Sequence, residues 1–431
     1  MAKKQELPPI QFTAAGSDEK TQQENLERIT PSPGYPTCVN LICDAIEKRS
    51  DTTVFDFTQQ MVNIRYRIDG MWHSMPPMDR ESGDLMMATL KQLAGMNYRE
   101  RRAKQEGAFQ SMLMKKKYKC RVISQGVPTG ERIALYINIP QPPTETLEDL
   151  GINKAVKNKL MESIQTNQGM IIAAALPGEG FTSIWRATLS ACDRLMRDFY
   201  VIEEKTRVEP EVINVTSIKF DESRNENPFT PIPNLLLQEP DVLSFTEPTD
   251  GGVIDQMVGL CERDFQVFTR IHGKHCIDAL LRFLVHKPDR KKLAAQLRCV
   301  VCMKVIRKLC PECRIPYVPH PKLLAQLGIP QGRVRQFYKA FEYKPGMVDA
   351  DDREIEPCLH CGGTGYYERT GIIEVLTISE KMRNVIIQTP RMDQLSLVAK
   401  NERHISMRDM GILAVASGLT SLEELQRVLK K

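Results

Sequence analysis

Hydrophobic and polar positions alternate with two different periods along the chain, and the change of period divides it into parts. Residues 1–34 are polar and rich in Gln, Glu, Lys, Pro and Ser, so we expect a disordered tail. Between residues 35 and 148, strand-like alternation such as that of Val62–Ile68 is mixed with amphipathic helical patterns such as that of Cys38–Lys48. This mixture predicts a small α+β domain, which ends in a proline-rich linker at residues 141–151.

Residues 149–431 form a second predicted domain, in which short apolar strands alternate with helices. The expected strands are Met170–Ala175, Phe199–Glu203, Val242–Phe245 and Phe265–Ile271. Such alternation predicts an α/β fold with a mostly parallel sheet and helices on both of its faces. The pattern also predicts a helix at Leu293–Leu309 and C-terminal helices over residues 378–431.

A glycine-containing turn follows the first of these strands. The P-loop pattern is G-x-x-x-x-G-K-[ST], in which backbone N–H groups and a lysine hold phosphates. In the window 175–182, Gly178, Gly180 and Thr182 fit this pattern, whereas Phe181 occupies the lysine position. The turn is therefore either a P-loop that has lost its main cation or an unrelated strand–turn–helix with Thr182 as the N-cap.

Polar residues lie just past the ends of the expected strands. They are Thr182, Glu203, Glu247 and His272. Because ligands of parallel sheets bind at the carboxyl ends of the strands, we expect these residues to share one site. The plainer alternative is that the carboxylates are solvated and the histidine is structural.

Four cysteines form two C-x-x-C pairs, Cys310 with Cys313 and Cys358 with Cys361. Two such pairs suit tetrahedral Zn²⁺, because each pair supplies two thiolate ligands. We therefore expect a structural zinc ion in a module at about residues 306–372. The other cysteines lie mostly in apolar surroundings, which predicts buried thiols.

Net charge and the lengths of the apolar runs indicate which classes of protein the chain can belong to. The chain has 431 residues and a net charge of +5, which is mild for this length and does not by itself indicate nucleic-acid binding. No apolar run approaches the length of a membrane span, and the N-terminus lacks the apolar core of a signal peptide. We therefore expect a cytoplasmic protein without a transmembrane segment.

Several segments together resemble the ATPases that drive type II secretion and type IV pilus assembly. The most specific ones are RKLCPECRIPY, CLHCGGTGYYERTGIIEVL and GILAVASGLTSLEEL, and the first domain adds RYRIDG and CRVISQGVPTGERIALYI. The resemblance covers residues from about 35 to 431. It implies a RecA-like P-loop NTPase domain behind a PAS-like domain, a hexameric ring, and attachment from the cytoplasm to an inner-membrane platform protein.

The resemblance also implies roles for individual residues. Glu203 falls in the acidic segment of the family, and Glu247 matches the glutamate that is expected to activate water. His272 falls in the histidine motif. Arg121, and more weakly Arg67, match first-domain arginines that reach the phosphates. ATP with Mg²⁺ is the cofactor that such a site implies.

The departures from the family pattern are nearly all losses of cations. Phe181 replaces the P-loop lysine, and Glu179 adds a carboxylate to the phosphate cradle. Arginines of the family are replaced by Ala108, Leu237 and Thr249. Because phosphoryl transfer depends on charge stabilisation, we expect impaired hydrolysis. Weak binding of Mg²⁺ and ATP could persist through the N–H groups of the turn and Thr182.

Three functions stay open at this point. The favoured one is a subunit with impaired hydrolysis, in a homo-hexamer or in a hetero-hexamer with a paralogous ATPase. The second is a working motor whose cations come from variant residues such as Lys205 and Arg207. The third and weakest is a zinc-ribbon protein that binds nucleic acid, although the resemblance implies no such partner. The family's long N-terminal recruitment domain has no match here, so we expect docking through other surfaces.

Overall fold

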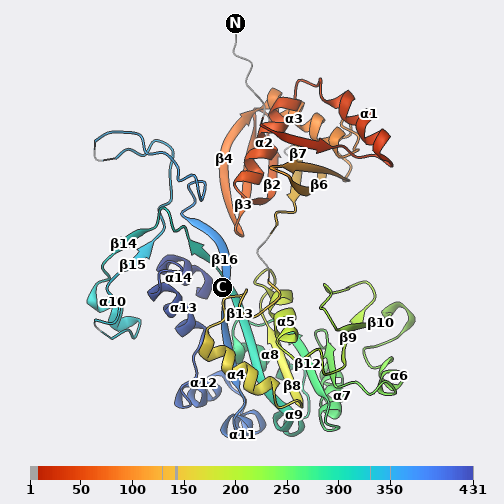
Figure 1. Cartoon of the computed structure of the whole chain (residues 1–431), viewed down its shortest axis with the longest axis vertical. Coiled ribbons are helices and arrows are strands. Elements are labelled where there is room, and N and C mark those ends of the chain that lie inside the picture. The colour runs from red at the N-terminus through yellow and green to blue at the C-terminus, as the bar shows by residue number, and fades with distance from the viewer. Residues whose placement is uncertain (1–7, 129, 141–143, 331, 350, 431) are drawn as a thin grey trace. The chain divides into compact units, whose positions relative to one another are not determined.

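The computed structural model describes residues 8–128, 130–140, 144–330, 332–349 and 351–430, which belong to two compact units (Figure 1). Unit 1 is the part up to Gln141, and unit 2 is the part from Pro142 onward. Leu147 and Leu150, which lie in the predicted linker, are buried in the core of unit 2. Unit 2 therefore starts before residue 149, the predicted boundary.

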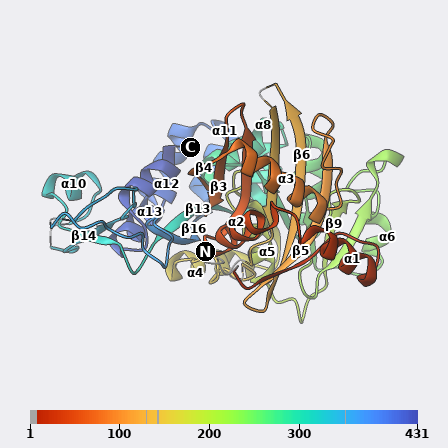
Figure 2. The same ribbon diagram turned by 90° about the horizontal axis from the view of Figure 1, so that it is seen from above.

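Unit 1 contains a seven-stranded antiparallel sheet with the strand order β1-β5-β6-β7-β2-β3-β4. Its strands are β1 (Ile10–Thr13), β2 (Ser50–Phe57), β3 (Met61–Ile68), β4 (Met71–Asp79), β5 (Gln105–Leu113), β6 (Lys116–Val127) and β7 (Gly130–Ile137). Alternate residues of β3 are buried, as the period of two in its sequence predicts. The helices α2 (Tyr35–Glu47) and α3 (Arg80–Leu93) pack against each other and against the sheet (Figures 1 and 2).

The first described residues belong to this fold. Ile10 and Phe12 of β1 are buried, and β1 pairs with β5. The helix α1 (Glu19–Ile29) is capped by Asp18, whose side chain accepts a hydrogen bond from the Thr21 backbone, and it ends in a buried isoleucine. The predicted disordered tail is therefore wrong over residues 8–34. The polar composition concealed these elements, because an edge strand and a one-sided helix bury few side chains.

Unit 2 is built on a second seven-stranded sheet with the order β10-β9-β11-β12-β8-β13-β16. All neighbouring strands are parallel except β13 and β16, which confirms the predicted α/β sheet. The strands are β8 (Gly169–Ala174), β9 (Phe199–Glu204), β10 (Thr216–Phe220), β11 (Val242–Phe245), β12 (Gln266–Ile271), β13 (Leu297–Leu309) and β16 (Tyr366–Thr377). A small separate sheet pairs β14 (Ile315–Tyr317) with β15 (Phe337–Lys339).

Eleven helices belong to the described part of unit 2. They are α4 (Lys154–Ile164), α5 (Phe181–Ser190), α6 (Ile232–Leu236), α7 (Gly251–Cys261), α8 (Cys276–Val285), α9 (Arg290–Gln296), α10 (Pro321–Gln326), α11 (Glu380–Gln388), α12 (Met392–Asn401), α13 (Met407–Ala416) and α14 (Leu422–Lys430), with a short 3₁₀ turn at Glu222–Arg224. The last four of these confirm the predicted helical C-terminus. The helix α5 follows the glycine turn directly and ends at Ser190.

One predicted element of unit 2 is wrong. The segment Leu293–Leu309 is not a single helix, because α9 ends at Gln296 and β13 begins at the next residue. The strand β13 lies between β8 and β16, so it is buried on both faces. A strand of this kind has no polar alternation, and its apolar run cannot be told from a buried helix by periodicity.

Candidate functional site

The turn between β8 and α5 has the backbone of a tight glycine turn. Gly178 and Gly180 adopt φ angles of 76° and 89°, which L side chains rarely tolerate. Gly180 is the N-cap of α5, and no side chain caps this helix. The helix therefore begins at Phe181, and the alternative with Thr182 as the N-cap is wrong. Uncapped N–H groups at a helix start are suited to an anion.

Phe181, at the predicted lysine position, makes aromatic contacts in this turn. Its ring centroid lies 4.1 Å from that of His272, with the two planes inclined by 31°. The guanidinium carbon of Arg270 lies 4.8 Å from the Phe181 ring centroid and 5.4 Å from that of Trp185. The turn therefore presents a ring where the P-loop pattern has a point charge.

Glu247 and His272 lie together beside this ring. The His272 backbone N–H donates to Glu247 Oε1 over 3.1 Å, and His272 Nε2 lies 3.6 Å from Glu247 Oε2. His272 Nδ1 is 3.1 Å from the carbonyl oxygen of Ala175. A carbonyl oxygen can only accept a hydrogen bond, so we infer that Nδ1 carries the proton and that Nε2 faces Glu247. Three of the predicted residues thus gather at the ends of β8, β11 and β12.

Glu203 lies apart from this group. It is only 2% exposed, and its carboxylate accepts hydrogen bonds from the Glu209 backbone, over 2.8 Å, and from the Ser217 hydroxyl. These bonds hold the turn after β9 against β10. Glu203 does not line the cavity that Phe181 borders.

That cavity has a volume of about 530 Å³ and contains more acids than cations. The carboxylates on its walls belong to Glu204, Glu209, Glu222, Glu226, Glu247 and Asp250. The cationic side chains are Arg207 and Arg270, and His272 adds an imidazole. Lys205, the other predicted substitute cation, instead lies 3.5 Å from Asp221. A wall of this charge does not balance a triphosphate.

Arg270 is a residue of this cavity that the motifs did not identify. It is the fifth residue of β12, is 7% exposed, and forms an ion pair with Glu209. Its Nε and Nη1 atoms have no hydrogen-bond partner among the described residues. The available signal was an arginine inside an apolar run that predicts a fully buried strand.

Arg67 and Arg121, the two arginines predicted to reach phosphates, lie on unit 1. Arg67 Nε is 2.5 Å from Asp51 Oδ1. Arg121 Nη1 is 3.2 Å from Glu106 Oε1, and its guanidinium carbon lies 4.9 Å from the centroid of the Tyr136 ring. Both side chains are thus engaged in ion pairs within unit 1.

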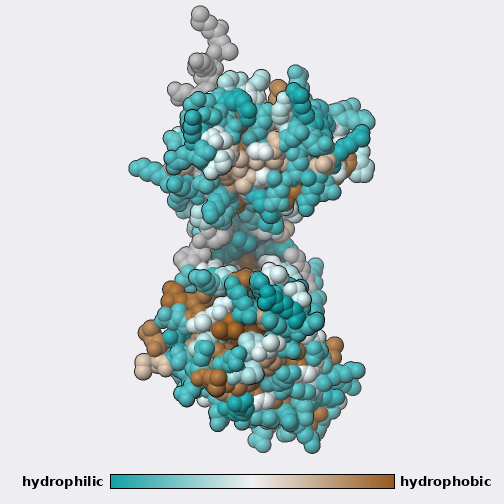
Figure 3. Space-filling view, turned by 90° about the vertical axis from the view of Figure 1, so that its right-hand side faces the viewer, coloured by the Kyte–Doolittle hydropathy of each residue, from teal (hydrophilic) through white to brown (hydrophobic). Residues whose placement is uncertain are grey.

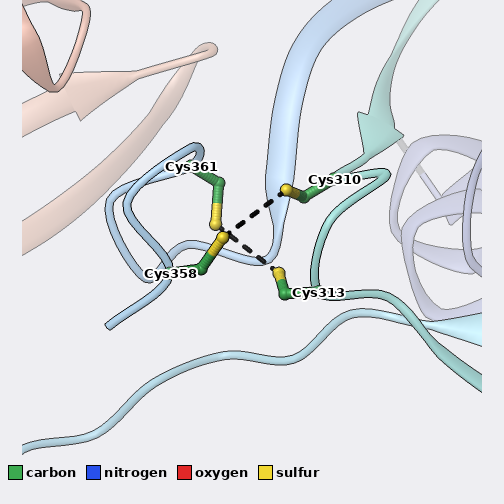
Figure 4. A group of neighbouring side chains, drawn as sticks. All are labelled: Cys310, Cys313, Cys358 and Cys361. Atoms are coloured by element: carbon green, nitrogen blue, oxygen red, sulfur yellow. Dashed lines mark hydrogen bonds between the residues drawn. The ribbon is translucent and has the colours of Figure 1, made fainter. Parts of the chain in front are cut away.

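The four predicted zinc ligands converge at one place in unit 2 (Figure 4). Cys310 and Cys313 follow β13, whereas Cys358 and Cys361 precede β16. The Sγ atoms of Cys310 and Cys358 are 3.9 Å apart, and those of Cys313 and Cys361 are 3.7 Å apart. Zinc–sulfur bonds of about 2.3 Å in a tetrahedron place sulfurs about 3.8 Å apart, so this donor set fits a zinc ion.

The remaining cysteines are buried thiols, as predicted. Burial raises the pKa of Cys120 to about 11 and that of Cys192 to about 12. Such thiols stay protonated and unreactive at neutral pH. The chemistry of cysteine in this chain is therefore concentrated in the tetracysteine group.

No described helix combines the length and the apolar composition that a membrane span needs.

Comparisons with known proteins agree with these features. The family described as Type II/IV secretion system protein matches residues 32–427. The chain is 25% identical over 420 residues to the type IV pilus assembly ATPase PilB of Pseudomonas aeruginosa, which covers 96% of this chain and 70% of that protein. It is 26% identical over 395 residues to the type II secretion system protein E of Dickeya dadantii, covering 91% of this chain and 74% of that protein.

A solved structure shows the same fold at low sequence identity. The X-ray structure of the Legionella pneumophila ATPase DotB aligns with a TM-score of 0.54 and 13% identity, and covers 90% of this chain and 94% of that chain. The family match spans both units and includes the glycine turn and the tetracysteine group. The chain therefore belongs to the type II/IV secretion system protein family.

Proposed function

We propose that this chain is a subunit of a type II secretion or type IV pilus assembly machine, with a nucleotide-binding fold and impaired ATP hydrolysis. The family match and the curated relatives support the machine. The observation that carries the impaired hydrolysis is Phe181, whose ring packs on His272 at the position of the P-loop lysine. Loss of one preorganised charge costs about 10²–10³ in rate, and this cavity also carries excess acid.

The finer architecture belongs to the same proposal. We assign unit 2 as RecA-like, because its glycine turn follows β8, which lies between β12 and β13 in a parallel sheet. We assign unit 1 as PAS-like, on the family resemblance and its antiparallel sheet with packed helices. Zn²⁺ is held by the tetracysteine group, and Mg²⁺ with ATP binds weakly at the glycine turn.

Assembly with other subunits is supported by exposed apolar side chains on unit 2. Figure 3 shows hydrophobic side chains gathered on one face of this unit. Exposed large hydrophobic residues of unit 2 include Leu195, Met196, Ile213 and Leu237. Apolar surface of this kind is typical of contact with a partner. The partners that we propose are further copies or a paralogous ATPase in a hexamer, and an inner-membrane platform protein reached from the cytoplasm.

One observation keeps a working motor as the second candidate. Arg207 lines the cavity together with the acids and would supply a cation to a nucleotide. Lys205 lies outside the lining and offers less. The weakest hypothesis, a zinc-ribbon protein that binds nucleic acid, stays a prediction that a salt-dependent DNA titration tests.

Phosphate release by the purified full chain with ATP and Mg²⁺ separates the first two candidates. We expect no magnesium-dependent turnover beyond that of Glu247→Gln, because the cation of the P-loop is missing. Glu262→Gln is a matched control, since Glu262 is an exposed acid of the same unit. Turnover by the wild type that Glu247→Gln abolishes and Glu262→Gln leaves intact would establish a working motor and refute the proposal.

A further inference from the structure

Arg270 is an unusual residue for the interior of a parallel sheet. Every residue of β12 is buried, and Arg270 is the only charged one among them. A buried guanidinium normally has all of its donors engaged, because an unpaired donor costs free energy. Here one ion pair, from Nη2 to Glu209, is formed, and Nε and Nη1 are without a partner among the described residues.

Two aromatic rings pack on the guanidinium of Arg270 and leave these donors without a hydrogen-bond partner among the described residues. The aromatic rings of Phe181 and Trp185 lie within 4.8 and 5.4 Å of the guanidinium carbon. Rings interact with the guanidinium through its π face, so they do not use the in-plane N–H groups. Arg270 lines the 530 Å³ cavity, which the uncapped start of α5 also borders at Phe181. The cavity is thus bordered by the guanidinium of β12 and by the uncapped backbone N–H groups at the start of α5.

We propose that Arg270 is the phosphate-binding cation of this cavity and that it supports nucleotide binding without restoring hydrolysis. The ligand that fits is a phosphoryl group of a nucleotide, because a guanidinium presents parallel N–H donors that match phosphate oxygens. The inference rests on the proposed function, since it takes this cavity as the nucleotide site. Phe181 then has a role of its own, which is to hold the guanidinium in place through its ring.

Glu209 gives the proposal its sharpest consequence. Its carboxylate is the counter-ion of Arg270 and competes with a phosphate for the same cation. Removing the charge of Glu209 therefore strengthens phosphate binding, whereas removing the charge of Arg270 weakens it. If the ion pair were purely structural, Glu209→Gln would weaken phosphate binding as Arg270→Gln does, because loss of either partner would disturb the site equally.

Binding is measured by calorimetry on the full chain, with ADP, a non-hydrolysable ATP analogue with Mg²⁺, and inorganic pyrophosphate as separate probes. We expect Arg270→Gln to weaken binding of each probe by about tenfold or more, which is the loss of one charge-assisted hydrogen bond. We expect Glu209→Gln to tighten it by about threefold or more. Arg282→Gln is the matched control, because Arg282 lies on α8 and pairs with Asp278 at the surface.

Folding is controlled by the double variant Arg270→Gln/Glu209→Gln, which removes both charges of the pair and leaves no buried ion unpaired. We expect it to bind as weakly as Arg270→Gln. Unchanged affinity in either variant that lacks Arg270, weaker binding in Glu209→Gln, or no binding of any probe to the wild type would overturn the inference. Turnover, measured separately through Glu247→Gln, decides the proposed function and is independent of these affinities.

Discussion

Replacing Glu424 by glutamine is expected to loosen the C-terminal helix from the sheet. Glu424 lies in the first turn of α14 and is 1% exposed. Its carboxylate accepts hydrogen bonds from the Arg307 backbone over 3.1 Å and from the Arg307 side chain over 3.1 and 2.8 Å. Arg427 adds donors at 2.7 and 2.6 Å. One buried carboxylate thus joins β13 to α14.

The loss of stability in Glu424→Gln follows from the buried arginine charge that the neutral amide leaves unpaired. Removing one partner of a buried ion pair costs about 3–5 kcal/mol, because the other charge stays buried. Arg307 has a side chain only 9% exposed, whereas that of Arg427 is 29% exposed and can recover water. The low end, about 3 kcal/mol, is therefore expected for Glu424→Gln. For a unit of this size, the loss lowers Tm by about 6–12 °C.

The pH dependence provides a second signature of the same interaction. Burial alone would raise the pKa of Glu424, but hydrogen bonds from Arg427 and Arg307 outweigh it and lower the pKa from 4.5 to about 2. A depressed pKa in the folded state stabilises the fold above the unfolded-state value, and the stabilisation is lost as the pH falls from 4.5 toward 2. This contribution is roughly 2–3 kcal/mol after solvent screening. The difference between wild type and Glu424→Gln should shrink over that pH range.

The assay is thermal and urea unfolding of the full chain, followed by tryptophan fluorescence. The chain has two tryptophans, of which Trp185 belongs to unit 2, so a Trp72→Phe background isolates the signal of that unit. Glu423→Gln is the matched control, because Glu423 is the adjacent, exposed acid of the same helix. If Glu424→Gln melts within about 2 °C of Glu423→Gln at pH 7, the reasoning from buried charge is refuted.

Three further predictions concern other parts of the molecule. Lys91→Met should destabilise unit 1 by about 3–5 kcal/mol in urea unfolding, because it leaves buried Glu131 unpaired, and Lys91→Met/Glu131→Gln should recover most of this loss. The purified chain should contain about one zinc ion by elemental analysis, and Cys358→Ser should lower both its zinc content and its Tm. Phe181→Ala should lower stability by about 1–3 kcal/mol through lost ring contacts, and an unchanged Tm would exclude a packing role for the ring.

Sequence patterns predicted much of the fold, where local signals are strong. The strand Val242–Phe245 has the expected bounds, because an apolar run flanked by polar residues marks it clearly. The strand β13 was missed because burial on both faces removes its alternation. The N-terminal strand β1 was missed because its partner β5 lies far along the chain. Pairing over such distances leaves no local pattern.

The candidate site shows the same division between local and distant information. The tetracysteine group follows from its spacing alone, and Glu247 and His272 follow from their positions after strands. The role of Arg270 could not be predicted, because it depends on Glu209 and on rings that other segments contribute. Glu203 was also expected just past a strand, but it is the fifth residue of β9, and its carboxylate accepts a hydrogen bond from the backbone of a neighbouring turn. The position of a residue near the end of a strand predicts at which edge of the sheet it lies, but it does not predict the direction of its side chain.

The tetracysteine group determines where residues can be inserted into this chain. It joins the end of β13 to the start of β16, two strands that are already paired in the sheet. The segment between the cysteine pairs, residues 314–357, therefore starts and ends at one fixed point of unit 2. Because the ends are held, lengthening this excursion adds little closure entropy, on the order of 0.6 kcal/mol for each doubling. Leu324 and Phe337 of this segment pack in the core of unit 2, so an insertion or a fused tag should be tolerated at the exposed residues 344–346, between β15 and β16.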